Sequence, residues 1–179
     1  MKKLQIGVVG YGFISGKGHI PAYAKRSDVE VVAIADVCAG RRALAAEALP
    51  AARIYFSYQE MLEAEKNLDV VDVSTPPCDH AEISVAALEK GIHVLCEKPL
   101  APTTEAARRM LAAAEKNKRV LFPCHNYKHA PVVKVIQDAI TSGRIGEVTS
   151  VTLQTFRNTH AKGVKEWRTD WRRDFKTSG

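Results

Sequence analysis

The feature that most constrains this chain is an alternation, over residues 4–123, of short β-branched apolar runs with longer helical stretches. Short strands that alternate with longer helices are typical of βαβ units and a parallel sheet. The pattern therefore predicts an α/β fold with a doubly wound parallel sheet. The expected strands are Leu4–Val9, Val29–Ala35, Arg53–Phe56, Val70–Ser74, Ile92–Cys96 and Val120–Pro123. The expected helices run from the loop after the first strand to about Lys25, and over Arg41–Ala48, Tyr58–Glu65, His80–Lys90 and Thr103–Asn117.

Local signals refine the helix ends. Pro21 lies inside the first expected helix and should kink or shorten it. Gly91 follows the fourth helix and is expected to terminate it. Thr103 and Thr104 are both candidates for the N-cap of the long fifth helix.

The pattern changes after Pro131, where a helix over Val132–Ser142 and a turn over Gly143–Gly146 precede an alternating stretch, Glu147–Phe156. This alternation predicts a strand of an antiparallel sheet covered on one side. We therefore expect a dinucleotide-binding domain over residues 1–124 and the beginning of a second α/β domain over 125–179. The strand lacks a sequential partner and should seek another edge, so we expect it to be mobile or paired within a homo-oligomer.

Composition and charge exclude several classes of protein. Apolar residues make up 46% of the chain, enough for a core, but no run approaches the ~20 residues of a membrane span. The net charge is +6, and residues 157–179 hold seven basic and three acidic residues. No recognition motif accompanies this basic segment, so we expect no nucleic-acid partner and no membrane partner. Without CxxC spacing, the cysteines are expected to be buried free thiols in a reducing cytoplasm: Cys38, Cys78, Cys96 and Cys124.

A glycine loop, Gly10-Tyr-Gly12-Phe-Ile-Ser15, follows the first expected strand and opens a helix. Gly10 permits a tight turn, and Gly12 lets the backbone approach a pyrophosphate. The helix start at Phe13 and Ile14 supplies N–H donors, and Ser15 is small enough for helix–strand packing. The loop predicts a Rossmann-type site for NAD or NADP; the alternative is a glycine-rich turn without a ligand.

Asp36 ends the second expected strand, where an acidic residue accepts hydrogen bonds from the adenosine ribose. A carboxylate there repels a 2′-phosphate, which favours NAD. Arg41 and Arg42 follow closely and could neutralise such a phosphate, or could belong to a solvated helix face.

Two further segments end strands at the same expected edge. Ser74-Thr75-Pro76-Pro77 follows the fourth strand and leads to His80, and Glu97-Lys98-Pro99 follows the fifth. Ligands of open α/β sheets bind outside the carboxyl ends of the strands. Lys98 could stabilise alkoxide charge on a hydroxyl that is being oxidised, with Glu97 orienting it; the alternative is an exposed charge pair. His125 and His129 beside Cys124 could suggest a metal, but no carboxylate is near in sequence and we expect none.

Together these segments resemble the Gfo/Idh/MocA family of NAD(P)-dependent oxidoreductases. The resemblance covers essentially the whole chain and is carried by Gly10–Ser15, Asp36, the segment 69–77 with His80, the segment 91–100, and His125-Asn126-Tyr127. It implies a catalytic role for Lys98 beside substrate and nicotinamide, and places Asn126 at the active-site border. It also implies that Trp171 and Arg172, within Trp171-Arg172-Arg173-Asp174, approach the cofactor from the second domain.

Two departures from the family pattern matter. Lys128 stands where the family often has arginine. In the family a glycine run continues beyond Gly179 to an aspartate and a histidine that complete the catalytic set, so the chain looks like roughly the first half of a member. The leading hypothesis is hydride transfer between nicotinamide and a hydroxyl carbon of a sugar, cyclitol or polyol. The alternatives are a nucleotide-binding module without turnover and a basic interaction protein.

Overall fold

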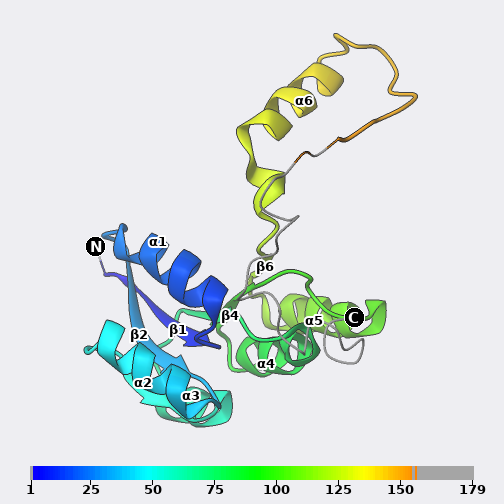
Figure 1. Ribbon diagram of the computed structural model, residues 1–179. Coiled ribbons are helices and arrows are strands. Elements are labelled where there is room, and N and C mark those ends of the chain that lie inside the picture. The colour runs from blue at the N-terminus through cyan, green and yellow to red at the C-terminus, as the bar shows by residue number, and fades with distance from the viewer. Residues whose placement is uncertain (1, 155, 157–179) are drawn as a thin grey trace. The chain divides into compact units, whose positions relative to one another are not determined.

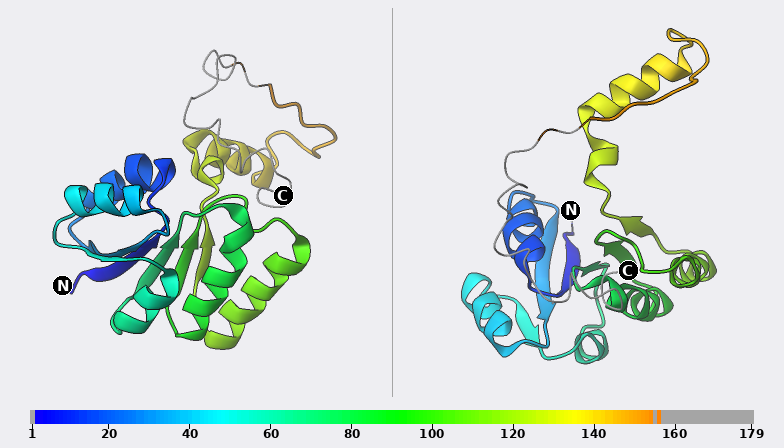
Figure 2. Two further views of the ribbon diagram at one scale, coloured as in Figure 1. Left: turned by 60° about the horizontal axis from the view of Figure 1, so that its bottom comes forward. Right: turned by 45° about the vertical axis from the view of Figure 1, so that its right-hand side comes forward.

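The computed structural model describes residues 2–154 and 156, and its contacts divide the chain into two compact units that separate between Cys124 and His125. In the first unit all strand pairs are parallel, and the sheet order is β3-β2-β1-β4-β5-β6. Helices cover both faces of this sheet (Figures 1 and 2). The predicted doubly wound Rossmann fold is therefore confirmed.

The elements of the first unit lie close to their predicted places. They are β1 (Leu4–Val9), η1 (Ser15–His19), α1 (Ile20–Ala24), β2 (Val29–Ala35), α2 (Ala39–Ala48), β3 (Arg53–Tyr55), α3 (Tyr58–Ala64), β4 (Val70–Val73), α4 (Pro77–Glu89), β5 (His93–Cys96), α5 (Thr104–Asn117) and β6 (Leu121–Pro123). The helix α4 begins at Pro77, three residues before the predicted start, because proline is favourable at the first helical position.

The residues that were predicted to end, cap or interrupt helices can be compared with the structure. Gly91 follows the end of α4 with a φ of 78°, a left-handed conformation that glycine adopts without strain. The hydroxyl of Thr103 accepts a hydrogen bond from the backbone N–H of Ala106 at 3.2 Å, so Thr103 is the N-cap of α5. Pro21 is the second residue of α1, and the helical backbone continues into α1 from the wide π-helical turn η1, which changes the hydrogen-bond spacing just before a proline that cannot donate.

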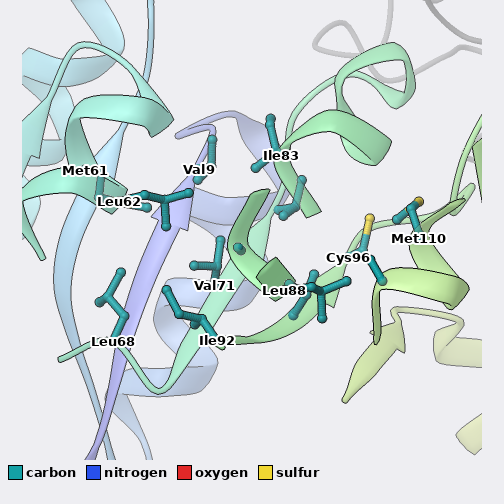
Figure 3. Close-up of a cluster of buried hydrophobic side chains, with 14 of the residues drawn as sticks. Val9, Met61, Leu62, Leu68, Val71, Ile83, Leu88, Ile92, Cys96 and Met110 are labelled. Carbon is teal, nitrogen blue, oxygen red and sulfur yellow. The ribbon is translucent and has the colours of Figure 1, made fainter. Parts of the chain in front are cut away.

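Alternation along the strands builds two cores, one on each face of the sheet. In β2, Ala33 and Ala35 belong to the core cluster on the face covered by α3, α4 and α5, while Ile34 belongs to the cluster on the face covered by α1 and α2. The larger cluster contains Met61 from α3, Leu88 from α4 and Met110 from α5 (Figure 3). The smaller cluster contains Ile6, Val8, Ile20, Ile34 and Ala45.

The second unit contains η2 (Asn126–His129) and α6 (Pro131–Thr141), and its helix agrees with the predicted one. The predicted strand over Glu147–Phe156 is wrong for the described part, because residues 147–154 form no strand. A strand needs a ladder partner for its N–H and C=O groups, and no described segment supplies one. Val148, Val151 and Leu153 are exposed instead. The division into separate domains at 124/125 stays a prediction.

Candidate functional site

The carboxyl ends of β1, β2, β4 and β5 meet at one edge of the sheet. Gly10 N–H donates to Ala35 C=O at 2.8 Å, Ser74 N–H to Val9 C=O at 2.8 Å, and Glu97 N–H to Val73 C=O at 2.9 Å. These backbone bonds hold the loops that follow four separate strands side by side. The edge includes the switch point between β1 and β4, where open α/β sheets bind their ligands.

The two glycines of the glycine loop have different environments. Gly10 has a φ of 92°, and a Cβ there would lie 2.7 Å from the carbonyl oxygen of Ser74. Gly10 is therefore required by both backbone conformation and close approach. A Cβ on Gly12 would meet only the Nη1 atom of Arg41, at 3.9 Å. The space over Gly12 fits the close approach of a pyrophosphate.

The first helical turn after the loop offers further donors. Gly16 N–H donates to Gly12 C=O at 2.9 Å, so the N–H groups of Phe13 and Ile14 belong to the first turn and have no helical acceptor. Ser15 is fully buried, as its predicted packing role requires. Among the described residues, the buried hydroxyls of Ser15, Thr75 and Ser84 find no hydrogen-bond partner, and all three are closed off from solvent. The groups of this turn that fit a phosphate-bearing ligand are therefore the N–H groups of Phe13 and Ile14.

Asp36 anchors the glycine loop to the end of β2. Its Oδ2 accepts the Tyr11 N–H and its Oδ1 accepts the Cys38 N–H, both at 2.8 Å, and the residue is only 6% exposed. A carboxylate oxygen has a second lone pair, so both oxygens can still accept from ribose hydroxyls. The Asp36 carboxylate is thus held in one orientation before any ligand arrives.

Arg41 and Arg42 have separate roles at this end of the sheet. The Arg41 Nη1 atom lies 3.9 Å from Asp36 Oδ2, next to the open space above Gly12. Arg42 donates to the carbonyls of Asp36 and Val37 at 2.8 and 3.0 Å and lies over the Phe56 ring. Arg42 therefore supports the backbone, whereas the half-exposed Arg41 faces the predicted cofactor space.

His80 connects the two loops that follow β4 and β5. Its Nδ1 lies 2.9 Å from the carbonyl oxygen of Pro99, its Nε2 lies 2.9 Å from that of Thr75, and the residue is fully buried. The ring therefore meets backbone rather than open space. Pro76, the residue before α4, completes the loop after β4. A cofactor role for His80 would be indirect, through the backbone of Thr75 and Pro99.

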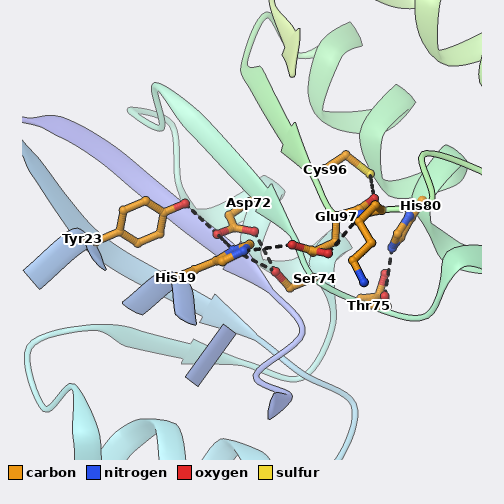
Figure 4. Close-up of polar contacts among 9 residues, drawn as sticks. His19, Tyr23, Asp72, Ser74, Thr75, His80, Cys96 and Glu97 are labelled. Carbon is orange, nitrogen blue, oxygen red and sulfur yellow. Dashed lines mark hydrogen bonds and ion pairs between the residues drawn. The ribbon is translucent and has the colours of Figure 1, made fainter. Parts of the chain in front are cut away.

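A buried polar cluster that the sequence patterns did not predict lies beneath the loop after β5 (Figure 4). His19 from η1 places Nδ1 2.8 Å from Asp72 Oδ2 and Nε2 3.1 Å from Glu97 Oε1. Asp72 also accepts hydrogen bonds from the Tyr23 hydroxyl at 2.7 Å and the Ser74 hydroxyl at 2.8 Å. A signal was present, since Asp72 interrupts the apolar run of β4, and a buried carboxylate requires partners.

The charges in this cluster perturb one another. Burial lowers the pKa of His19, but the hydrogen bonds and charges of Asp72 and Glu97 outweigh it and raise the pKa to about 10. Burial raises the pKa of Glu97, but its hydrogen bonds with His19 and the Lys98 N–H lower it overall. The cluster therefore holds an imidazolium between two carboxylates at neutral pH.

Glu97 and Lys98 have contrasting exposures. Glu97 is buried, and its Oε2 accepts the backbone N–H of Lys98 at 3.0 Å. The Lys98 side chain is exposed at the sheet edge, and the Lys98–Pro99 peptide bond is cis. Glu97 thus orients Lys98 through the backbone, and the ammonium group remains accessible to ligands.

His19, Glu97 and Cys124 have ligand atoms within 4.8 Å of one another, a spacing that could hold a metal ion. Both ring nitrogens of His19 already pair with carboxylates. Burial, with the nearby Glu97 and Asp72 charges, raises the pKa of the Cys124 thiol to about 12. We therefore assign no metal to this cluster.

The remaining predicted residues are the four cysteines, Asn126, Trp171 and Arg172. All four cysteines are free, as expected, but Cys38 and Cys78 are exposed, so their predicted burial is wrong. Each follows the end of a strand and occupies the start of a helix on the surface. Asn126 begins η2 in the second unit. Trp171 and Arg172 lie outside the described residues.

A six-stranded parallel sheet with an open glycine loop at its switch point defines a dinucleotide-binding protein. The profile of the Gfo/Idh/MocA group, described as an oxidoreductase family with an NAD-binding Rossmann fold, matches residues 4–125. The chain belongs to this family.

Similar proteins agree with this assignment. The chain is 35% identical over 164 residues to D-glucoside 3-dehydrogenase of Escherichia coli, covering 92% of this chain and 46% of that protein. It is 34% identical over 169 residues to inositol 2-dehydrogenase of Salmonella typhimurium, covering 93% and 49%. The chain thus spans about half the length of these curated relatives.

Solved structures show the same fold with cofactors bound. The WlbA dehydrogenase from Bordetella pertussis, in complex with NADH and UDP-GlcNAcA, has a TM-score of 0.77 at 32% identity, covering 81% of this chain and 44% of that one. KijD10, a 3-ketoreductase from Actinomadura kijaniata in complex with NADP and TDP-benzene, has a TM-score of 0.72 at 31% identity, covering 82% and 44%. Among the described residues, no helix is long and apolar enough to cross a membrane.

Proposed function

We propose that this chain forms the cofactor-binding part of an NAD(P)-dependent dehydrogenase that acts on a hydroxyl carbon of a sugar, cyclitol or polyol. The observation that carries this proposal is the convergence of the open glycine loop, Asp36 and the accessible Lys98 at one sheet edge. The printed activities of the relatives, on glucosides and inositol, support the substrate class.

The cofactor would lie across the switch point of the sheet. Gly10, Gly12 and the N–H groups of Phe13 and Ile14 would hold the pyrophosphate, and Asp36 would accept from the adenosine ribose. Ser74, Thr75 and Pro76 would border the nicotinamide half together with Glu97. When bound, the cofactor supplies the hydride acceptor or donor of the reaction.

Lys98 would contact the reacting oxygen of the substrate. Its ammonium group can donate a hydrogen bond to the hydroxyl and stabilise the negative charge that develops as the hydride leaves. Glu97 would keep the lysine backbone at the sheet edge through the 3.0 Å hydrogen bond from the Lys98 N–H. Asn126, Trp171 and Arg172 would complete the pocket from the second domain, in a cytoplasmic homo-oligomer.

A titration with NADH tests the cofactor site. The 179-residue chain should bind NADH, and Gly12→Val should abolish binding, because its side chain would enter the open space over the loop. The same variant should unfold at the wild-type denaturant concentration, since no described atom lies within 3.4 Å of a Cβ at this position. Unchanged NADH affinity in Gly12→Val would refute the assignment of the pyrophosphate to this loop.

A nucleotide-binding module without turnover is the second candidate. The observation that favours it is that, in the described first unit, the ring nitrogens of His19 face two carboxylates and those of His80 face two backbone carbonyls, so neither ring is available as a base. Both candidates require NADH binding, so turnover with polyols separates them.

A further inference from the structure

We infer that His19 acts as a positioning residue that is positively charged at neutral pH, and that its imidazolium joins Asp72 to Glu97 and thereby fixes the backbone of Lys98. The catalytic importance of this inference rests on the proposed function, because the role of Lys98 at the reacting oxygen is part of that proposal. The charge state and the connection between His19 and Lys98 can be tested without any turnover.

Hydrogen-bond chemistry requires a proton on each ring nitrogen. Nδ1 faces a carboxylate oxygen of Asp72 at 2.8 Å, and Nε2 faces a carboxylate oxygen of Glu97 at 3.1 Å. A neutral imidazole has only one N–H, so it could donate to one carboxylate and would turn a lone pair toward the other. Only the imidazolium satisfies both contacts as a donor.

Charge balance gives a second and independent reason. Asp72 is fully buried and Glu97 is 8% exposed, and both contact the same imidazole ring, so a protonated ring pairs two buried carboxylates that would otherwise lack a cation. The groups that face His19 or share its carboxylates are Tyr23 from α1, Asp72 and Ser74 from β4 and the loop after it, Glu97 with its neighbour Lys98, and Cys124. Burial, with the charge of Asp72, raises the pKa of Tyr23, and the Cys124 thiol also stays neutral.

The connection to Lys98 runs through the two oxygens of Glu97. Oε1 pairs with His19 Nε2, while Oε2 accepts the Lys98 backbone N–H at 3.0 Å. Because both ends of the carboxylate are occupied, rotation of the Glu97 side chain would break one bond or the other. Loss of the imidazolium should therefore release the loop that carries Lys98.

The first experiment measures the protonation of His19 in the wild-type chain. Proton–nitrogen NMR of the imidazole groups, recorded from pH 6 to 11 with a chelator present, should show both His19 nitrogens protonated at pH 8.5. An ordinary histidine is neutral at this pH. Glu97→Gln should move the His19 midpoint to lower pH, whereas His93→Gln, at the opposite end of β5, should leave it unchanged. A His19 ring that loses its proton near pH 6.5 in the wild type would overturn the inference.

The second experiment measures the effect on Lys98. Hydrogen exchange of the Lys98 amide should accelerate about tenfold or more in His19→Gln, with NADH affinity reduced, while His93→Gln keeps both wild-type values. If His19→Gln fails to fold, Asp72→Asn provides the readout, because it weakens the ion pair from the other side and leaves the acceptor of the Lys98 N–H in place. Unchanged Lys98 exchange in a folded variant would contradict the connection. Failure of the wild type to bind NADH would instead refute the proposed function and leave the protonation result intact.

Discussion

At the scale of single residues, the cofactor site combines groups already fixed by the protein with one group that remains available. Asp36 and Arg42 are held by backbone hydrogen bonds, whereas Arg41 is half-exposed and lies 3.9 Å from the Asp36 carboxylate. This arrangement places a carboxylate and a guanidinium where a 2′-hydroxyl or a 2′-phosphate would lie. The balance between these two charges should determine cofactor choice.

We expect NAD to bind more tightly than NADP, because the fixed Asp36 carboxylate repels a phosphate. Arg41→Ala should weaken NADP binding by about fivefold to tenfold, the loss of one exposed charge-assisted contact, and should change NAD binding little. Arg42→Ala is a useful comparison, since loss of its bonds to the Asp36 and Val37 carbonyls should weaken both cofactors. Calorimetric titration measures all four affinities, and tighter wild-type binding of NADP would argue against the role given to Asp36.

His19 should also make stability depend on pH. Its pKa rises from an ordinary value near 6.5 to about 10 on folding, so its contribution is full below pH 6.5 and is lost as pH rises through about 10. One retained proton lowers the free energy of unfolding by up to about 1.4 kcal/mol per pH unit between pH 7 and 8. Denaturation of wild type and His19→Gln over this interval should show a steeper fall in wild type. Cysteines of the unfolded chain begin to lose protons near pH 8, but they do so in both proteins, so the difference between the two slopes reports His19.

At the scale of elements, sequence patterns predicted the bounds of those strands and helices whose conformation depends mainly on nearby residues. The strands β1 and β2 begin and end at the predicted residues, because short apolar, partly β-branched runs fit a buried sheet and are bounded by turn residues. The strand over 147–156 could not be predicted in this way, since alternation shows which face is apolar but not whether a partner strand exists. The His19 cluster was missed for a similar reason, because η1, β4 and the loop after β5 become neighbours only in the folded sheet.

The start of α5 offers a sharp test at this scale. Thr103→Ala should lower the free energy of unfolding by about 1 kcal/mol, because the hydroxyl that accepts the Ala106 N–H is lost. Thr104→Ala is the matched control, since Thr104 is the first residue inside the helix and should change stability by less than about 0.5 kcal/mol. Equal effects in urea denaturation would show that the cap does not contribute.

At the scale of the whole molecule, we expect these 179 residues to bind NADH without oxidising polyols at a useful rate. Oxidation requires a base for the hydroxyl proton, and in the first unit His19 pairs with two carboxylates while His80 faces two carbonyls. General-base catalysis contributes about 10²–10⁴ in rate, and substrate positioning contributes about 7–11 kcal/mol. The measurement is NAD reduction with a polyol panel on protein of verified mass. Turnover that Lys98→Ala abolishes would show that the chain is catalytically sufficient.

The order of strands makes the stability of the sheet depend on whether a dinucleotide is bound. Strands β1 to β3 form one side of the sheet and β4 to β6 the other, and the two sides pair only where β1 meets β4. The proposed cofactor position crosses this junction, so a bound dinucleotide would contact both sides. Neither side could then separate without first releasing the ligand. Thermal unfolding should therefore shift upward with the logarithm of NADH concentration, and the two sides should melt as a single cooperative unit.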